Sequence, residues 1–331
     1  MQLHTKALTI GYKLNSSVKL LENVTISGNT YEIIALLGLN GTGKSTLIKT
    51  LLKLLNPLKG EICINNININ TFTANKLAKT ISYVSTEIAV VTDMRVHEMV
   101  ELGRTPYSGW MGVLSNTDYE KVEEAINLLD IKHLKNKKIT AISDGERQRV
   151  MIARALAQDT PFIILDEPTA FLDLLHKYDL IIQLKNLAHL LGKCIIFSTH
   201  DLNIAFKIAD KIWLLHQHQI EEGAPEDLIY QKIPQQIFNN ERIFFDADKT
   251  DIVFYRNNFN HISVINESRN PEKTEIIHKF LFRAGYKPLN NPDPDFPVIV
   301  ITDSGFKLLQ NNTIAEVKSV YELSGILKYK N

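Results

Sequence analysis

The sequence predicts an α/β fold built on a parallel core sheet. Residues 162–165, 194–198 and 212–215 are short apolar runs with the length and composition of buried strands. Helical patterns separate these runs, and a further apolar run at residues 31–37 leads directly into a glycine-rich loop. Strands that alternate with helices in this way are typical of a parallel sheet covered by helices.

The elements around the glycine-rich loop follow from local patterns. Short strands are expected at residues 8–10, 18–21 and 24–26, where apolar side chains are bounded by polar turns. Residues 46–55, directly after the loop, have helical periodicity. Residues 60–69 alternate between apolar and polar side chains around two asparagines, and this pattern predicts a hairpin.

A helix-rich and strand-poor stretch follows at about residues 75–140. We expect it to form a helical subdomain that is inserted into the sheet fold, with its clearest helices at residues 96–102 and 118–129. The later helices, which separate the core strands, are expected at residues 146–157, 176–190 and 202–209.

Two domains are expected, residues 1–235 and residues 236–331, because the length exceeds one usual domain and the sequence pattern changes near residue 232. The second region reads as a small C-terminal α+β domain without a motif of known chemistry. Its hairpin at residues 241–258 carries three aspartates at the turn, and such a cluster is more often a solvated tip than a metal site. The other elements expected there are a helix at 275–284, a strand at 298–302 and a helix at 314–328.

The composition describes a globular chain and narrows its partners. Hydrophobic residues make up 44% and charged residues 22%, so the chain can bury an ample core. Lys+Arg and Asp+Glu are 37 each, and this balance disfavours nucleic acid as a partner. No apolar run reaches the roughly 18 residues of a membrane span, and the N-terminus lacks the pattern of a secretory signal. Two isolated cysteines, Cys63 and Cys194, fit a reducing compartment, so we expect a cytoplasmic protein that acts at a membrane only through a partner.

Residues 38–45 satisfy the G-x-x-x-x-G-K-[ST] pattern of a phosphate-binding loop, and Thr46 follows directly. Its glycines let main-chain N–H groups approach phosphate oxygens, and the following helix presents the positive end of its dipole. Lys44 is expected to bind the β- and γ-phosphates of ATP, and Ser45 to supply a hydroxyl ligand for Mg²⁺. The loop consists of Gly38, Leu39, Asn40, Gly41, Thr42, Gly43, Lys44, Ser45 and Thr46. The chain is therefore predicted to bind and hydrolyse ATP.

Two carboxylates, Asp166 and Glu167, follow the apolar run at residues 162–165. We expect Asp166 to hold Mg²⁺ through water and Glu167 to act as the general base that polarises the attacking water. An apolar run that ends in Asp-Glu is common by itself, so the assignment depends on the motifs around it.

Those motifs resemble the ATP-binding cassette (ABC) proteins. Residues 166–173, Asp-Glu-Pro-Thr-Ala-Phe-Leu-Asp, resemble the family's Walker B motif and D-loop. Residues 198–201, Ser-Thr-His-Asp, resemble its H-loop, which implies that His200 contacts the γ-phosphate. Residues 142–149 take the place of the family's signature sequence, and Tyr12 that of an aromatic residue that stacks on adenine.

The resemblance covers roughly residues 1–230 and implies a P-loop NTPase cassette with an antiparallel β subdomain and the helical insert. It also implies a head-to-tail dimer, in which ATP on one copy is capped by Ser143 and Gly145 of a second copy.

Within the family, the segment Gly-Arg-Thr-Pro-Tyr at residues 103–107 looks like the importers of ferric siderophores, haem and vitamin B12, although a plain turn is the competing interpretation. Residues 157–161 and 199–203 agree with the same group. The resemblance implies an ATPase subunit peripheral on the inner face of the cell membrane. Its partners would be a separate permease, docked by the helical insert, and, indirectly, a substrate-binding protein. The cargo is not identified by these motifs.

Two motifs, the signature sequence and the Q-loop, depart from the family pattern. Asp144 and Glu146 put two carboxylates into the signature where the family has glycine and glutamine, and Asp144 could serve as a helix cap. Thr86 stands where the Q-loop has a metal-sensing glutamine, so it would reach Mg²⁺ only through water unless Glu87 substitutes for it. A weakly catalytic regulatory subunit therefore stays open as an alternative, as does a soluble ABC protein outside transport.

Overall fold

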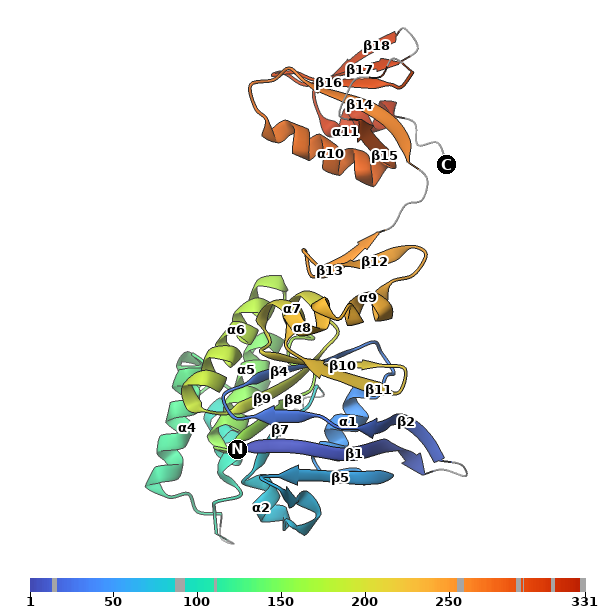
Figure 1. Ribbon diagram of the computed structural model, residues 1–331. Coiled ribbons are helices and arrows are strands. Elements are labelled where there is room, and N and C mark those ends of the chain that lie inside the picture. Colours follow the sequence, from blue (N-terminus) through green and yellow to red (C-terminus); the bar gives the residue numbers. More distant parts are fainter. Residues whose placement is uncertain are drawn as a thin grey trace. The chain divides into compact units, whose positions relative to one another are not determined.

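The computed structural model describes residues 1–13, 17–86, 93–109, 112–254, 259–289, 293, 295–310 and 313–327. The chain divides into two compact units, Met1–Asn239 with Phe245–Ile252, and Asn240–Phe244 with Val253–Asn331. Figure 1 shows the elements of each unit. Among the described residues, no helix is both long and apolar enough to span a bilayer.

The core of the first unit is a six-stranded sheet in the order β11-β10-β4-β9-β8-β7. Five of its strands pair in parallel and only β11 is antiparallel, so the predicted parallel core is confirmed. Successive residues of β4 contribute to two different hydrophobic clusters, because side chains alternate between the faces of a strand. The strands are β4 (Ile33–Gly38), β7 (Ile81–Val84), β8 (Phe162–Leu165), β9 (Cys194–Thr199), β10 (Lys211–His216) and β11 (Gln219–Gly223).

A second, antiparallel sheet contains the order β2-β1-β5-β6, and β3 also pairs with β1. The turn between β5 and β6 is made by Asn65 and Asn66, whose φ angles of 48° and 64° are left-handed. The predicted hairpin is confirmed, since asparagine tolerates this conformation better than most residues. The strands are β1 (Gln2–Lys13), β2 (Ser17–Val24), β3 (Ser27–Asn29), β5 (Lys59–Ile64) and β6 (Ile67–Asn68).

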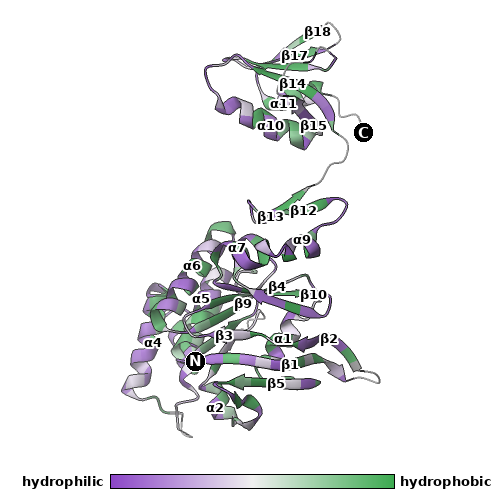
Figure 2. Cartoon of the chain, in the orientation of Figure 1, coloured by the Kyte–Doolittle hydropathy of each residue, from purple (hydrophilic) through white to green (hydrophobic). Residues whose placement is uncertain are grey.

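Helices pack on both faces of the core sheet, with α1 on one face and α6 and α7 on the other. In Figure 2, much of α4 has the colour of hydrophilic residues. Four 3-10 turns add to these helices: η1 (Ile69–Thr71), η2 (Leu102–Arg104), η3 (Lys132–Leu134) and η4 (Ile139–Ala141). The α-helices are α1 (Lys44–Leu51), α2 (Ala74–Ala78), α3 (Val96–Glu101), α4 (Asn116–Leu128), α5 (Asp144–Ala157), α6 (Leu174–Leu191), α7 (Leu202–Ile208), α8 (Pro225–Tyr230) and α9 (Ile233–Phe238).

The expectation of a strand-poor stretch from about residue 75 is wrong at β7. This strand pairs in parallel with β8 and forms one edge of the core sheet. It has only four residues, and Ser82 and Tyr83 interrupt its apolar character, so it lacks the continuous run that marks the other core strands.

The second unit holds a mixed sheet in the order β15-β14-β16-β17-β18. Helix α10 is amphipathic (Figure 2), and its buried residues Ile277, Phe280, Leu281 and Ala284 share one face. The elements are β14 (Asn260–Asn266), α10 (Glu272–Ala284), β15 (Tyr286–Leu289), β16 (Val298–Ile301), β17 (Phe306–Gln310), β18 (Thr313–Val317) and α11 (Val320–Ile326). Before them, β12 (Ile243–Asp246) and β13 (Asp251–Phe254) form the predicted hairpin.

The predicted final helix at residues 314–328 is wrong in its first part. Thr313–Val317 is instead a strand, paired antiparallel with β17, and α11 begins only at Val320. Ile314 and Val317 are three residues apart, a spacing that also suits a helix, so the local pattern could not exclude one.

Candidate nucleotide site

Three predicted motifs meet at the carboxyl ends of strands in the core sheet. Strand β4 leads into the glycine-rich loop, β8 into Asp166 and Glu167, and β9 into His200. Leu37 lies beside Thr199, and Leu165 beside Phe197, in the parallel pairing of these strands. The carboxyl ends of parallel strands are where α/β proteins bind ligands.

The loop has the backbone that phosphate binding requires. Gly41 and Gly43 have φ angles of 81° and 104°, which favour glycine. Helix α1 begins at Lys44 without a side-chain cap, so its first N–H groups point toward the loop unpaired by a capping side chain.

Lys44 is held inside the loop. Its Nζ donates to the carbonyl oxygens of Gly38 at 2.7 Å and Leu39 at 3.1 Å, and the residue is 7% exposed. Burial lowers the pKa of Lys44, while the negative charges of Glu167 and Asp166 oppose this shift. The ammonium group therefore lies within electrostatic reach of both predicted carboxylates.

The two carboxylate residues share one hydroxyl partner, Ser198. Ser198 Oγ donates to Asp166 Oδ1 at 2.7 Å and accepts the main-chain N–H of Glu167 at 2.8 Å. Glu167 Oε1 lies 3.9 Å from His200 Nδ1, and the His200 side chain is 63% exposed. Ser198 was not among the predicted site residues; its only signal in the sequence is its place two residues before His200.

Thr86 contacts Asp166 through a hydrogen bond to the Asp166 backbone. Its Oγ1 donates to the main-chain carbonyl of Asp166 at 2.9 Å, so its hydroxyl proton is already in use. Its contact with Mg²⁺ stays a prediction, and Glu87, the possible substitute, lies outside the described residues.

Tyr12 lies beside the loop. Its hydroxyl forms a hydrogen bond of 2.9 Å with Thr46 Oγ1, and 42% of the residue is exposed. The ring is therefore open to a ligand at the loop, while stacking on adenine stays a prediction.

The signature segment forms the start of α5. Ser143 is the N-cap: its Oγ accepts the Glu146 N–H, while its own N–H and hydroxyl donate to Glu146 Oε2 at 2.8 and 2.9 Å. These two bonds, the main-chain one first, hold the pKa of Glu146 below its usual value. Asp144 is not the cap that the sequence allowed, because Ser143 occupies that position; Asp144 is the first helical residue and pairs with Arg147 at 2.8 Å. A Cβ on Gly145 would lie 2.9 Å from the Leu172 side chain.

The structure thus brings together the loop, Tyr12, Thr86, Asp166, Glu167 and His200. In the part of the chain that the structure describes, Ser143 and Gly145 make no hydrogen bond or ion pair with this group. The capping of ATP by Ser143 and Gly145 of a second copy therefore stays a prediction.

Residues 103–107 form the end of η2 and a turn, which packs closely against neighbouring helices. A Cβ on Gly103 would lie 2.2 Å from the carbonyl oxygen of Arg154. Arg104 pairs with Asp118 at 2.8 Å, and its guanidinium lies 3.8 Å from the centre of the Tyr107 ring. These contacts join η2 to α4 and α5.

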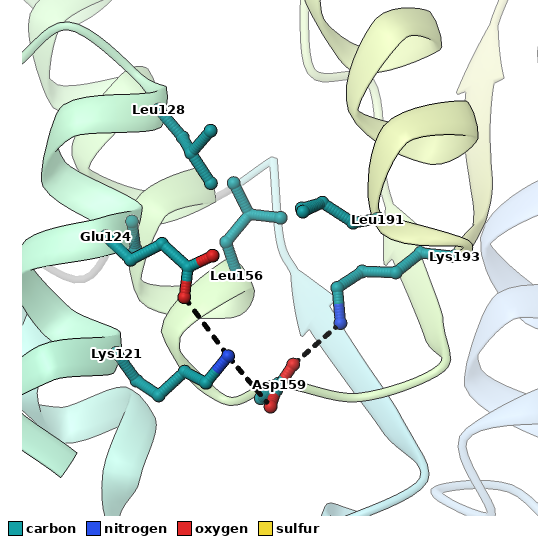
Figure 3. A pocket seen from close by; sticks show the side chains of 8 residues that line it. Lys121, Glu124, Leu128, Leu156, Asp159, Leu191 and Lys193 are labelled. Carbon is teal, nitrogen blue, oxygen red and sulfur yellow. Dashed lines mark hydrogen bonds and ion pairs between the residues drawn. The ribbon is translucent and has the colours of Figure 1, made fainter. Parts of the chain in front are cut away.

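A pocket of about 130 Å³ lies between α4 and the ends of α5 and α6. Figure 3 shows Lys121 and Lys193 pointing toward Asp159, at 3.5 and 2.9 Å. Lys121 also pairs with Glu124 at 3.1 Å. These ion pairs link α4 to the residues that follow α5 and α6. The residues that line the pocket are separate from those of the nucleotide site.

A larger apolar groove, of about 500 Å³, lies beside α1, α2 and β7. Its lining includes Leu52, Phe72, Leu77, Ile81 and Tyr83. Tyr83 is three residues before Thr86, so the groove adjoins the strand that leads to the nucleotide site.

Comparison with known proteins identifies the family. The ABC transporter family model matches residues 21–170. An ABC transporter ATP-binding protein of Methanocaldococcus jannaschii is 37% identical over 76% of this chain and 85% of its own length. The achromobactin transport ATP-binding protein of Dickeya dadantii is 35% identical, over 71% and 87%. The ferric enterobactin transport ATP-binding protein of Escherichia coli is 31% identical, over 74% and 90%.

Solved structures agree with these relatives. A dimeric ABC transporter cassette has a TM-score of 0.60 and 28% identity, covering 67% of this chain and 98% of its own. A dimeric cassette in a post-hydrolysis state, bound to ADP and phosphate, has a TM-score of 0.59 with the same identity and coverage. The resemblance predicted from the motifs is confirmed: the chain belongs to the ATP-binding subunits of the ABC transporter family and is an ATPase of that family.

Proposed function

We propose that this chain is the ATP-hydrolysing subunit of an importer that takes up an iron–siderophore through a separate permease. The observation that carries the proposal is the convergence of the glycine-rich loop, Asp166–Glu167 and His200 at one sheet edge. The siderophore assignment has its support in the relatives named for achromobactin and ferric enterobactin transport. Haem and cobalamin are the other cargoes of the group predicted from the sequence.

In the proposed site, the main-chain N–H groups of the loop bind the phosphates of ATP. Lys44 exchanges the carbonyl oxygens of Gly38 and Leu39 for phosphate oxygens. Glu167 accepts the proton of the attacking water, and His200, 3.9 Å away, contacts the γ-phosphate. Tyr12 stacks on the adenine.

The oxygen donors of the site fit Mg²⁺, which prefers hard oxygen ligands. Ser45, exposed in the first turn of α1, offers a hydroxyl, and Asp166 follows β8 with its Oδ1 bonded to Ser198. Mg²⁺, when bound, neutralises charge on the β- and γ-phosphates. Thr86 would take part only through water.

Two partners complete the proposal. A second copy caps the ATP with Ser143 and Gly145, and the dimeric arrangement of two similar cassettes supports this. The permease inserts a cytoplasmic segment into the apolar groove of about 500 Å³ lined by Leu77 and Tyr83. This arrangement holds the chain at the inner face of the membrane, and a substrate-binding protein acts only through the permease.

Substitution of the general base tests the hydrolytic part. Glu167→Gln in the full chain should abolish ATP hydrolysis while ATP binding persists, and size-exclusion chromatography with ATP should then detect a stable dimer. Glu124→Gln, which changes an exposed carboxylate on α4, is the matched control and should hydrolyse ATP like the wild type. Wild-type turnover by Glu167→Gln would refute the assignment of the base.

Partner and cargo need separate tests. Leu77→Glu places a charge in the groove and should abolish co-purification with the permease without weakening ATP binding by the isolated chain. Loss of the gene should remove growth on a ferric siderophore as the sole iron source but not growth that depends on haem or cobalamin. The opposite growth pattern would exclude the siderophore assignment.

A further inference from the structure

The hydroxyl of Ser198 lies between the two carboxylate residues of the site. Ser198 is fully buried in β9, with 0% exposure. We propose that Ser198 is a positioning residue for hydrolysis, which fixes the orientation of the Asp166 carboxylate and the backbone of Glu167. This inference rests on the proposed function, because it concerns the groups that would activate water and hold the metal ion.

The direction of both hydrogen bonds is determined. The N–H of Glu167 can only donate, so Ser198 Oγ must accept it at 2.8 Å. A hydroxyl has a single proton, and the Ser198 proton is therefore left for Asp166 Oδ1 at 2.7 Å. Because the serine is fully buried, bulk water does not compete for these bonds.

The bond to Glu167 restrains a residue in an uncommon conformation. Its φ of 46° lies in the left-handed region, which costs free energy for a side chain other than glycine unless the surroundings impose it. The Ser198 bond to its N–H and the bond from Ala170 N–H to its carbonyl, at 3.1 Å, hold it there. Without the serine hydroxyl, the backbone can relax and carry the general base away from His200.

Asp166 is restrained on three sides. Its N–H donates to the Val84 carbonyl at 2.9 Å, its own carbonyl accepts from Thr86 at 2.9 Å, and Oδ1 accepts from Ser198. Among the described residues, no side chain forms a hydrogen bond with Asp166 Oδ2. Ser198 therefore determines which carboxylate oxygen is left free to bind a water ligand of the metal.

The first test compares Ser198→Ala with a rescue variant and a matched control. Ser198→Ala should lower kcat by about 10- to 100-fold, as loss of a group that orients a metal ligand does, while KM for ATP stays within about twofold because the loop is untouched. Ser198→Thr keeps a hydroxyl and should restore most of the turnover. Ser82→Ala removes another buried serine hydroxyl of the same sheet, bonded to Thr160 rather than to a carboxylate, and should leave kcat unchanged.

The second test does not need turnover. Mn²⁺ serves as the probe, and its affinity for the full chain loaded with a non-hydrolysable ATP analogue is measured by electron paramagnetic resonance. Ser198→Ala should weaken Mn²⁺ binding by about tenfold, and Ser82→Ala should not. Wild-type kcat together with wild-type Mn²⁺ affinity in Ser198→Ala would overturn the inference. Normal hydrolysis by Glu167→Gln would instead overturn the proposed base, and the Mn²⁺ comparison would still decide the role of Ser198.

Discussion

The buried ion pair between Arg104 and Asp118 leads to a quantitative stability prediction. Arg104 Nε and Nη2 donate to Asp118 Oδ1 at 2.9 and 2.8 Å, and its Nη1 donates to the Ala157 carbonyl at 2.7 Å. Asp118 Oδ2 accepts the N–H and the hydroxyl of Ser115 at 2.9 and 2.6 Å. Both charged side chains are only 7% exposed, so the pair links η2, α4 and the end of α5 away from water.

Removal of one partner should be costly, and removal of both should not. Asp118→Leu leaves the Arg104 guanidinium buried without a counter-charge, which costs about 3–5 kcal/mol, and Arg104→Met has a similar cost for the opposite reason. Asp118→Leu also removes a bond of the α4 capping box, worth about 1 kcal/mol. The double variant replaces a buried pair by apolar groups, so it should lose only about 1–2 kcal/mol.

Equilibrium unfolding in urea, followed by tryptophan fluorescence, measures these free energies. Glu124→Gln breaks the exposed pair with Lys121 and is the control, expected to change stability by about 0.5 kcal/mol or less. Single variants that unfold at the wild-type midpoint, or a double variant as unstable as the two singles added together, would refute the reasoning.

The same pair predicts a dependence on pH. Hydrogen bonds from Ser115, and then the Arg104 guanidinium, hold the pKa of Asp118 below its usual value. A lowered folded-state pKa gives stability that is fully present above the unfolded value of about 3.9 and is lost as the pH falls through the folded value. The gap in unfolding free energy between the wild type and Asp118→Asn should therefore be largest near neutral pH and shrink below about pH 4. A gap that widens in acid would contradict this assignment.

Three further changes have defined outcomes. Gly103→Ala forces a Cβ to within 2.2 Å of the Arg154 carbonyl oxygen and should destabilise the chain by at least about 1–3 kcal/mol in thermal unfolding. Tyr12→Ala should weaken ATP binding by about tenfold, and Tyr12→Phe much less, because base stacking on an aromatic ring is worth about 1–3 kcal/mol; equal affinity of Tyr12→Ala and wild type would exclude stacking. A chain that ends at residue 252 keeps Phe245, which is 3% exposed and whose ring centre lies 5.2 Å from that of Phe206. A chain that ends at residue 235 lacks Phe245, and its free energy of unfolding should be lower by about 3–5 kcal/mol. Equal melting of these two truncated chains would show that Phe245 adds nothing to the first unit.

The fold was predictable where a strand is long and apolar. Phe162–Leu165 has the bounds expected from the sequence, because every residue of that strand is buried on both faces of the sheet. Short strand β7 was missed, since its place at the sheet edge is determined by pairing with β8, about 80 residues later in the chain. Strand β18 was predicted as helix for a related reason. It is a strand because it pairs with β17, where Leu309 lies opposite Ile314, and this pairing forms only when the chain folds back.

The candidate site could be predicted where its functional residues are consecutive in the sequence. The loop around Lys44 and the pair Asp166–Glu167 depend on local spacing, so the sequence was enough to propose them. Ser198 depends on the parallel pairing of β8 and β9, which brings together residues 31 and 32 positions apart. No local pattern could have assigned its hydroxyl to both carboxylate residues.

The two carboxylates of the signature segment are largely compensated inside α5. Asp144 is neutralised by Arg147, and Glu146 by two hydrogen bonds from Ser143. Both also lie in the first turn, where the helix dipole favours negative charge. These departures therefore affect mainly the Ser143 hydroxyl, which Glu146 engages, rather than the net charge of the site. The hydroxyl proton of Ser143 is used by Glu146 at 2.9 Å. In the proposed dimer, the hydroxyl would have to rotate away from Glu146 before it could donate to a phosphate, while the Ser143 N–H could keep Glu146 in place.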